Sequence, residues 1–339
     1  MRAVWIRKHG GPEVLEVRET EDPTPGPGEV RVRAKACGLN FAEVSARQGI
    51  YPDAPKPPCV VGYEGAGEVD ALGDGVDDLE VGDRVMFISR FGGHSDTVVV
   101  GRHQAVKIPD ALSFEDAAAM PVNYLTAYQM LMRVRRILPG DKILIHSAAG
   151  GVGTACLQLA ATVEDVTVFG TASASKHDYL RSLGCHHPID YRSTDYVDAV
   201  NEITGGGGID LVCDPLGGAD WKKGYSILRP GGLLICFGFA NASKAGKRNL
   251  LRVLWEMLKV PFFHPLGLMD KNRAVAGVNL GSQWDDHEGI QGGMQQIIRY
   301  WEAGQARPHI DSTFPFDQAA EAFGRLEHGK NVGKVILVP

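Results

Sequence analysis

The sequence has no pair of cysteines with the spacing of a metal or redox motif. None of its six cysteines is close enough to another to form a C-x-x-C pair. Four of them fall in segments that we expect to be buried, where cysteine acts as a small apolar side chain in a reducing compartment. We therefore expect a cytoplasmic protein with free thiols at Cys37, Cys59, Cys156, Cys185, Cys213 and Cys236.

Long apolar runs and basic stretches are also missing. No run reaches the roughly 20 residues that a transmembrane helix needs, and the opening MRAVWIRKHGGPEVLEV lacks the apolar core of a secretory signal. The net charge is −6 over 339 residues, and no basic stripe offsets it, so nucleic acid is not an expected partner. With 44% hydrophobic and 22% charged residues, the composition is that of an ordinary globular protein, and the length favours two domains.

The most informative segment that is present is HSAAGGVGTACLQLA, residues 146–160. It follows an apolar run, 142–145, that predicts a strand, and it leads into a helical pattern. Strand, glycine turn and helix form the arrangement that binds a dinucleotide pyrophosphate on the free N–H groups of the first helical turn. The residues expected to contact the cofactor here are Ala149, Gly150, Gly151, Val152 and Gly153.

The patterns of strands and helices divide the chain into three parts. The first 120 residues contain short strand-like runs separated by Pro and Gly clusters. From 142 to 238, strand-like runs alternate with helices of about ten residues, which predicts a doubly wound parallel sheet. After about residue 270 strand patterns return, beginning with 273–280. We therefore expect a β-rich catalytic domain, 1–121 plus 266–339, with a nucleotide-binding domain, 122–265, inserted in it.

Seven motifs then fall in a recognisable order: ACGLNFAEVSARQGIYP, VVGYEGAGEV, GDRV, PVNYLTAY, AAGGVG, DPLGG and GKVIL. In these the chain resembles the medium-chain dehydrogenase/reductase superfamily, and within it the zinc-independent quinone oxidoreductase type. The resemblance covers essentially the whole length and implies an α/β fold, a Rossmann-type doubly wound sheet inserted in a GroES-like domain. A narrower resemblance, in FGTASASKHDYLRSLG, DPLGGADWKKGY and NRAVAGVNLG, is to the vesicle amine transport protein homologues.

The end of the second predicted strand indicates which dinucleotide is bound. A carboxylate about 20 residues past the glycine motif would recognise the ribose 2′-hydroxyl of NAD. Here the chain reads GTASASK, with no acidic residue between Gly170 and Lys176. Hydroxyls and a cation suit a 2′-phosphate, so we expect NADPH. The expected contacts are Thr171, Ser173, Ser175, Lys176 and Tyr191.

Further cofactor contacts are expected beyond the carboxyl ends of the later strands. The DPLGG turn and the FGF segment should face the cofactor, and the resemblance implies that the Asn-Leu-Gly segment completes the nicotinamide site. Lys334 in GKVIL is a weaker candidate for phosphate contact. These residues are Asp214, Leu216, Phe237, Gly238, Asn279, Leu280, Gly281 and Lys334.

The resemblance also exposes missing metal ligands. Zinc dehydrogenases of the superfamily place catalytic ligands at three positions held here by Asn40, Tyr63 and Val122. Asparagine and tyrosine are poor zinc ligands, and valine is none. The closely spaced cysteines of the structural zinc lobe are absent from 89–112, and the 11 histidines show no ligand spacing. We therefore expect no metal.

Without a Lewis acid, hydride addition suits acceptors that delocalise their own negative charge, such as quinones and α,β-unsaturated carbonyls. The acceptor oxygen then needs a hydrogen-bond donor. Asn40 is the first candidate; Tyr51, Tyr63 and Tyr124 follow, since a phenol with a pKa near 10 suits an acid. In the alternative interpretation, Tyr63 only fills the space of the missing metal and Tyr51 only shapes the pocket.

Two surface features leave alternatives open. Residues 247–268, KRNLLRVLWEMLKVPFFHPLGL, predict an amphipathic helix ended by Pro261 and followed by an apolar loop. This helix either packs on its own domain and roofs the substrate cleft, or contacts a membrane surface through an apolar face that includes Trp255. The run 274–280 resembles the edge by which relatives pair their sheets, which implies a homodimer.

Three functions remain after this reasoning. The first is an NADPH-dependent reductase of quinones or activated enones. The second is an enoyl-thioester reductase, which would need a basic cleft that we do not find. The third is an NADPH-binding regulatory or lipid-handling protein with little turnover.

Overall fold

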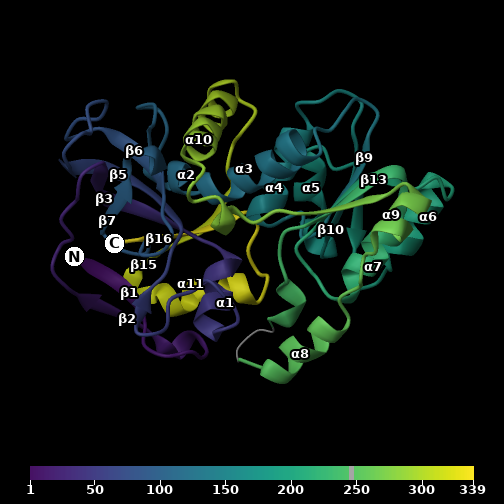
Figure 1. The fold of residues 1–339 in the computed structure, drawn as a ribbon, viewed down its shortest axis with the longest axis horizontal. Helices are drawn as coiled ribbons and strands as arrows, with labels where there is room; N and C mark the ends of the chain where they lie inside the picture. Colours follow the sequence, from purple (N-terminus) through teal and green to yellow (C-terminus); the bar gives the residue numbers. More distant parts are fainter. Residues whose placement is uncertain (244–247) are drawn as a thin grey trace. The chain divides into compact units, whose positions relative to one another are not determined.

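The computed structural model describes residues 1–243 and 248–339, which form two compact units. The first unit holds Met1–Leu125 and Leu280–Pro339, and the second holds 126–243 and Asn249–Asn279. A segment in the middle of the chain thus interrupts a unit built from both of its flanks (Figure 1). The predicted fold class, a parallel α/β sheet inserted in a β-rich domain, is confirmed.

The first unit is built on a mostly antiparallel sheet and a smaller three-stranded sheet. The strands described in the larger sheet are β3 (Glu29–Leu39), β5 (Glu64–Leu72), β6 (Arg84–Ile88), β7 (Thr97–Gly101), β8 (Ala105–Lys107), β15 (Ile310–Pro315) and β16 (Lys334–Val338). Their order is β15-β16-β3-β5-β6-β8, and β7 also pairs with β3. The smaller sheet contains β1 (Arg2–Ile6), β2 (Leu15–Glu19) and β4 (Cys59–Val60).

Short helices cover these strands. The described helices of the first unit are α1 (Phe41–Gln48), α2 (Phe114–Ala118), α10 (His287–Glu302) and α11 (Ala319–Glu327), and the boundary between the units falls within α3 (Pro121–Tyr128). The 3-10 turns here are η1 (Pro12–Val14), η2 (Arg102–Gln104), η6 (Leu280–Ser282) and η7 (Phe316–Gln318). Alternating apolar side chains of β3 and β16 meet Phe316 and Phe323 in one core, because successive side chains of a strand point to opposite faces.

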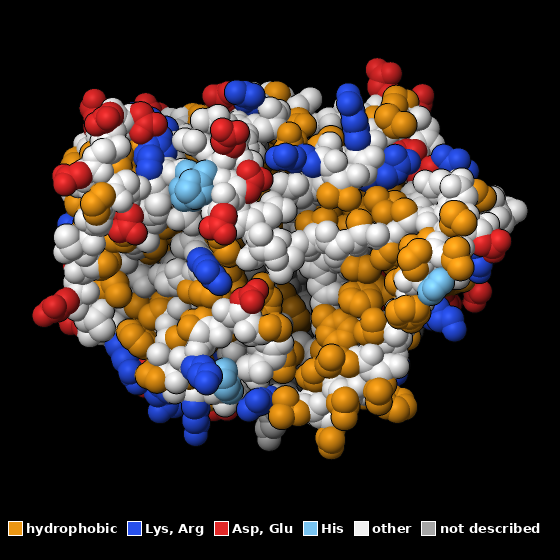
Figure 2. Space-filling view, viewed as in Figure 1, with side chains coloured by type: hydrophobic (Ala, Val, Ile, Leu, Met, Phe, Trp, Pro, Cys, Tyr) orange, Lys and Arg blue, Asp and Glu red, His pale blue; other side chains and the backbone are white. Residues whose placement is uncertain are grey.

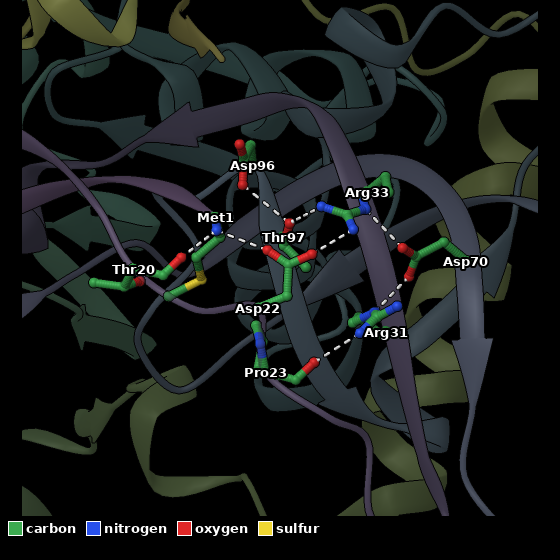
Figure 3. A network of polar contacts seen from close by, with 9 residues as sticks. All are labelled: Met1, Thr20, Asp22, Pro23, Arg31, Arg33, Asp70, Asp96 and Thr97. Carbon is green, nitrogen blue, oxygen red and sulfur yellow. Dashed lines mark hydrogen bonds and ion pairs between the residues drawn. The ribbon is translucent and has the colours of Figure 1, made fainter.

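Charged side chains tie the start of the chain to β3 (Figure 3). Asp22 pairs with the amino group of Met1 at 2.7 Å and with Arg33. Arg31 and Arg33 also share Asp70, at 2.8 and 2.6 Å. Pairs that remain partly exposed stabilise little one by one, but together these pairs join Met1 and Asp22 to β3 and β5.

The second unit is a parallel sheet with helical crossovers. Its described strands are β9 (Lys142–Ile145), β10 (Thr167–Ala172), β11 (His187–Asp190), β12 (Ile209–Asp214), β13 (Leu228–Cys236) and β14 (Ala274–Gly277), in the order β11-β10-β9-β12-β13-β14. The order reverses at β9, which is the switch point where ligands bind in doubly wound sheets. The helical segments are η3 (Gln129–Val134, a π-helix), α4 (Gly151–Ala160), η4 (Ala174–Lys176), α5 (His177–Ser182), α6 (Tyr196–Thr204), α7 (Ala219–Ser226), η5 (Ala240–Ala242), α8 (Leu250–Leu258) and α9 (Pro265–Lys271). In Figure 1, α4 and α5 lie together, and α6 and α7 lie together at another side of the strands.

Strand β14 joins the parallel sheet of the second unit, not the β-rich unit that the sequence pattern predicted. We expected 273–280 to return to the β-rich domain, but β14 pairs in parallel with β13, with Leu233 opposite Ala274. A four-residue apolar run carries no information about which sheet it joins, because parallel and antiparallel edge strands have the same local pattern. Residues 266–279 accordingly lie in the second unit.

The segment after Pro261 is also more ordered than expected. The predicted apolar loop contains α9, which begins with Pro265 and is capped by the ring of His264. Proline at the first helical position and a capping side chain before it are ordinary helix starts. Of the predicted amphipathic segment 247–268, Lys247 lies outside the described residues.

Helix α8 exposes its apolar side. Its buried side chain is Glu256, which pairs with Lys259 at 2.9 Å, and Arg252 donates to the carbonyl of Asn241 at 2.7 Å. The interpretation in which the apolar face packs on its own domain is therefore wrong. Orange side chains gather over this helix at the lower edge of Figure 2. The exposed apolar residues of α8, α9 and the link between them are Leu250, Leu251, Leu254, Trp255, Met257, Leu258, Val260, Phe262, Leu266 and Met269. No helix in the described ranges is long and apolar enough to cross a membrane.

Candidate active site and dinucleotide-binding turn

The glycine turn joins β9 to α4 in the second unit. Gly150 caps the helix with an extended backbone, and α4 starts at Gly151. A Cβ on Gly153 would lie 2.5 Å from the Cα and the carbonyl oxygen of Ala148 and equally close to the carbonyl oxygen of Ser147. Only glycine fits that close approach, which brings the first turn of α4 and its unpaired N–H groups onto the loop. Ala149 and Val152 lie in the same turn.

Thr171 supports this turn. Its carbonyl accepts the N–H of Ala148 at 3.0 Å, and its hydroxyl accepts the N–H of Ser147 at 3.2 Å. The same hydroxyl lies 3.1 Å from Nδ1 of His146. Thr171, expected as a cofactor contact, thus shapes the loop from the neighbouring strand.

The expected 2′-phosphate residues gather at the ends of β10 and β11. The hydroxyls of Ser173 and Ser175 are 3.3 Å apart. Ala172, the last residue of β10, is in register with Asp190, the last residue of β11. Ser173 and Tyr191 directly follow these two residues. The guanidinium of Arg192, which sequence reasoning missed, lies 5.7 Å from the ring centroid of Tyr191. Its position beside that tyrosine in the DYR segment was the available signal. Lys176 ends η4 next to these residues.

Asp214 shapes the turn after β12. One carboxylate oxygen accepts the N–H groups of Leu216 at 2.5 Å and Gly217 at 3.1 Å. The other is buried with no hydrogen-bond partner among the described residues. Burial raises the pKa of Asp214 to about 7. An unpaired buried oxygen beside a glycine turn is a group that a bound ligand can satisfy.

The loops after β12 and β13 are bonded together. Phe237 donates its N–H to the carbonyl of Asp214 at 3.0 Å, and a Cβ on Gly238 would meet the carbonyl oxygen of Pro215 at 2.8 Å. Asn241, another residue that sequence reasoning missed, donates to the carbonyl of Gly217 at 3.1 Å. The predicted residues Asp214, Leu216, Phe237 and Gly238 therefore share one edge of the sheet. Asn279 follows β14 in the same direction, and Leu280 and Gly281 begin η6 in the first unit.

In the first unit, Asn40 is the centre of a buried polar cluster. Its amide nitrogen donates to Glu64 at 2.7 Å and to Glu43 at 3.4 Å. Its amide oxygen accepts from the ammonium of Lys334 at 2.6 Å, and Lys334 also binds Glu64 directly. The second oxygen of Glu64 accepts the N–H of Val122 at 2.7 Å. The side chains of this cluster are fully or almost fully buried.

This cluster changes the roles expected of two residues. Asn40 was the first candidate donor to the acceptor oxygen, but both its amide groups are occupied within the protein. Lys334, expected to touch a phosphate, is only 3% exposed and binds a carboxylate and an amide instead. The short GKVIL motif gave no signal of this, because the partners Asn40 and Glu64 are far away in sequence.

Glu43 is an acid held in its neutral form. Burial raises its pKa to about 8 from 4.5, against the opposing effect of Lys334. His94 lies 3.9 Å from it, and burial lowers the pKa of His94 to about 4, so the ring is neutral. The cluster thus combines the ion pair of Lys334 and Glu64 with a neutral acid and a neutral imidazole.

Glu43 gives a testable pH dependence. Because its folded pKa is above its ordinary value, the folded protein binds the extra proton, and stability falls as pH rises from about 4.5 through about 8. His94 and His146, with lowered pKa values, act with the opposite sign only below about pH 6.5. From pH 6.5 to 8 we therefore expect the free energy of unfolding to fall by up to about 1.4 kcal/mol per pH unit from Glu43, and the melting temperature to fall with it. Asp214, whose pKa is raised to about 7, adds a contribution of the same sign near pH 7. Thermal unfolding across this range measures it.

The control for that prediction is a matched pair of variants. Glu43→Gln places a neutral amide where the neutral acid lies, so its melting temperature should depend less on pH than that of the wild type. Glu68→Gln changes a half-exposed glutamate that pairs with Lys35 at the surface, and it should keep the wild-type slope. Equal slopes in the wild type and Glu43→Gln would rule out Glu43 as the titrating group.

Tyr63 lies beside this cluster, within a group of aromatic rings. Its ring centroid is 6.2 Å from Tyr51, 5.2 Å from Phe91 and 6.4 Å from Trp284, whose ring is nearly parallel to it. The hydroxyl of Tyr63 is buried and interacts with the hydroxyl of Tyr51, but neither Tyr51 nor any other described residue gives it a hydrogen bond of good geometry. Burial raises the pKa values of Tyr51 and Tyr63, so both phenols keep their protons and can donate. Tyr124 is fully buried and has an interaction partner.

Trp284 is a site residue that sequence reasoning missed. It lies between η6 and α10, outside every motif, and no local pattern marks it. It contacts Tyr63 only because residues 280–339 belong to the same unit as the N-terminal part of the chain.

Comparisons with known proteins agree with this architecture. Residues 26–128 match the alcohol dehydrogenase GroES-like domain, and residues 183–337 match a family described as zinc-binding dehydrogenase. Within 1–243 and 248–339, no group of three or more His, Cys, Asp or Glu side chains is placed to hold a metal ion.

Relatives at useful identity cover nearly the whole chain. The human synaptic vesicle membrane protein VAT-1 homolog is 47% identical over 328 residues, 96% of this chain and 82% of the relative. A quinone oxidoreductase of Pseudomonas aeruginosa is 35% identical over 342 residues, covering 100% and 99%. The crystal structure of Escherichia coli quinone oxidoreductase complexed with NADPH superposes with a TM-score of 0.88 at 30% identity, over 100% of both chains. The chain therefore belongs to the medium-chain dehydrogenase/reductase family, as a homologue of its quinone oxidoreductases and of the VAT-1 proteins.

Proposed function

We propose that this chain is an NADPH-dependent oxidoreductase that reduces quinones or activated α,β-unsaturated carbonyls by direct hydride addition, without a metal. The observation that carries the proposal is the unpaired, buried hydroxyl of Tyr63 among the rings of Tyr51, Phe91 and Trp284. A buried hydroxyl that has only a second phenol, Tyr51, beside it, inside an aromatic wall, suits the oxygen of a planar, conjugated acceptor.

The residues of the second unit fit a bound NADPH. The pyrophosphate would lie on the first turn of α4, where Gly153 leaves no room for a side chain. The 2′-phosphate would be held by Ser173, Ser175, Lys176 and Tyr191, with Arg192 as a second cation. The quinone oxidoreductase of similar structure is described as an NADPH complex, which supports the same choice here. Bound NADPH would supply the hydride.

The chain's own part in the reaction is binding and hydrogen-bond donation. The aromatic residues would hold the acceptor and exclude water, and Tyr63 would donate to the oxygen on which negative charge develops. With the hydride from NADPH and the one proton from solvent, one quinone, one NADPH and one proton give a hydroquinone and NADP⁺. Asn40 would keep Tyr63 in place rather than touch the acceptor, since its amide is already bound to Glu64 and Lys334.

Turnover on a panel of acceptors tests this proposal against its rivals. Oxidation of NADPH, followed by its absorbance, is measured with menadione, an acyclic enone and an enoyl thioester. We expect turnover with the quinone or the enone. Turnover with the thioester alone would replace the proposal by an enoyl-thioester reductase. Tight NADPH binding without turnover on any acceptor would favour a regulatory role.

Lys176 is predicted to determine the preference for NADPH. Lys176→Ala removes the cation beside Ser173 and Ser175 and should weaken NADPH binding about tenfold, since a hydrogen bond to a charged group is worth about 1.5–3 kcal/mol. NADH has no 2′-phosphate, so its affinity should not change. Titration of nicotinamide fluorescence measures both dissociation constants. Lys222→Ala, an exposed lysine of α7, is the control. If NADPH and NADH bind the wild type equally, the assignment of the cofactor is wrong.

A second proposal concerns the exposed face of α8. We propose that this face contacts a lipid surface, because it exposes leucines, Trp255 and Met257, while Arg252 lies on the same short helix and Lys259 caps its end. The relative named as a synaptic vesicle membrane protein supports this choice. Flotation with vesicles of phosphatidylcholine, with and without phosphatidylserine, tests it. We expect the protein to float with the anionic vesicles and Leu254→Glu to remain at the bottom.

A homodimer is proposed from the edge of the parallel sheet. Ala274 and Gly277 of β14 are exposed, and within the described chain β14 pairs on one side only. A second copy would pair there. Sedimentation measures this, and a monomer at micromolar concentration would exclude it. If Leu254→Glu also dissociates a dimer, then the α8 face belongs to that interface and the lipid proposal fails.

A further inference from the structure

Lys334 is placed beside Asn40 by its strand. β16 runs antiparallel to β3 with Val335 opposite Leu39, so that Lys334 and Asn40 are the next pair. The residue before Lys334 must be a glycine. Gly333 has a φ of 75°, and a Cβ there would lie 2.1 Å from the carbonyl oxygen of His309. Lys334 donates its own N–H to that same carbonyl at 2.8 Å.

The ammonium of Lys334 is buried and binds only buried side chains among the described residues. It binds the amide oxygen of Asn40 and the carboxylate of Glu64, and Glu64 also accepts from the Asn40 amide nitrogen. The other charged groups packed against this cluster are accounted for. Glu43 is a neutral acid, and Arg47 pairs with Glu327 at 2.9 Å. These contacts restrict the side chains of Lys334, Asn40 and Glu64 to one arrangement. Rotation of any of the three would leave a buried charge or amide without its partner.

Both phenols of the aromatic group are attached to this cluster through the backbone. Glu64 directly follows Tyr63. Asn40 precedes α1, whose other end is held where Arg47 and Gln48 bind Glu327. Tyr51 follows that helix after the turn at Gly49. Lys334 thus connects the two segments that carry Tyr51 and Tyr63.

We propose that Lys334 is a positioning residue for the reduction: by binding Asn40 and Glu64 together, it fixes where Tyr51 and Tyr63 present their hydroxyls. The inference rests on the proposed function, because it takes those hydroxyls to face the acceptor. It also assigns a use to the three positions where metal dehydrogenases of the family have ligands. Asn40 and Val122 bind Glu64, and Tyr63 adjoins it.

The experiment compares a buried pair with an exposed one. Lys334→Met alone leaves the carboxylate of Glu64 buried without its cation and is expected to unfold at lower temperature. The double variant Lys334→Met/Glu64→Gln removes both charges, so the fold is retained while Asn40 loses its donor. Lys35→Met is the matched control, since Lys35 pairs with Glu68 at 3.2 Å on neighbouring strands at the surface.

Three measurements are made on each variant: steady-state kinetics with menadione, which give kcat and KM; titration with NADPH, which gives the dissociation constant; and hydrogen exchange of residues 41–51. For the double variant we expect kcat to fall at least about tenfold, as small misplacements do, with the NADPH dissociation constant unchanged within about twofold. Exchange in 41–51 should speed up about tenfold or more, while peptides of the second unit exchange as before. Lys35→Met should match the wild type in all three.

The outcomes separate the two proposals. If the double variant keeps wild-type kcat and wild-type exchange in 41–51, Lys334 only balances a charge and the inference is overturned. If exchange speeds up but kcat is unchanged, the positioning has no catalytic effect, and the inference is equally overturned. If the wild type reduces no acceptor at all, the proposed function fails. In that case, exchange in 41–51 still decides whether Lys334 fixes the segment that carries Tyr51.

Discussion

Replacing Tyr63 with phenylalanine is expected to lower kcat for quinone reduction about a hundredfold while leaving the protein at least as stable. Loss of one donor to a developing oxyanion costs about 10²–10³ in rate. The stability should not fall, because the hydroxyl of Tyr63 is buried without a partner, and removal of an unpaired polar group relieves its desolvation cost. NADPH binding should not change. Steady-state kinetics, thermal unfolding and cofactor titration measure the three quantities.

If Tyr63→Phe loses activity but keeps its stability, Tyr63 acts as a hydrogen-bond donor and does not merely fill space with its ring. Phenylalanine fills the same space as tyrosine, so a residue that only occupies the missing metal's place would leave kcat unchanged. Tyr225→Phe provides the control, since Tyr225 packs against Phe263 in the second unit. A wild-type kcat in Tyr63→Phe would remove Tyr63 from the mechanism and return attention to Tyr51.

Addition of a single methyl group at Gly153 is expected to disrupt the dinucleotide turn. In Gly153→Ala, the new Cβ would lie 2.5 Å from backbone atoms of Ser147 and Ala148, which cannot rotate away as a side chain can. The start of α4 must then move, at a cost of about 1–3 kcal/mol in folding. We also expect NADPH affinity to fall tenfold or more, because the N–H groups that would bind the pyrophosphate move with the helix.

Gly292→Ala is the matched control for this prediction. Gly292 lies within α10, exposed, with open space around its hypothetical Cβ. The same methyl group there should stabilise the fold by about 0.4–1 kcal/mol, because alanine has less freedom to lose on folding. NADPH binding equal in Gly153→Ala and the wild type would contradict the role given to the turn.

The sequence predicted those features that depend on local signals. The dinucleotide turn is one: Gly150, Gly151 and Gly153 stand between an apolar strand and a helix within 15 residues, so a short window contains the whole motif. The alternation of strands and helices from 142 to 238 predicts the parallel sheet for the same reason. The hydroxyl and lysine residues after β10 also stand in one short segment, although their contact with a cofactor stays a prediction.

The features that sequence reasoning missed depend on tertiary contacts. Lys334 meets Asn40 across 294 positions of chain, and nothing near GKVIL indicates a carboxylate partner. β14 has the composition of either sheet, and only its neighbour β13 decides which it joins. The apolar stripe of α8 was visible in the sequence, but the stripe does not say whether it faces the protein. In the structure the polar residue Glu256 takes the buried side.

The position of β16 between β15 and β3 also bears on how the polypeptide matures during translation. A ribosome releases Asn40, Glu43 and Glu64 long before Lys334, which lies 270 residues after Glu64. Until β16 emerges, the carboxylate of Glu64 lacks the cation that it pairs with, and enclosing it would be costly. The nucleotide-binding segment, whose parallel strands are all released before β16, can acquire its structure first. We therefore expect the buried cluster of the first unit to close only after Lys334 has been synthesised.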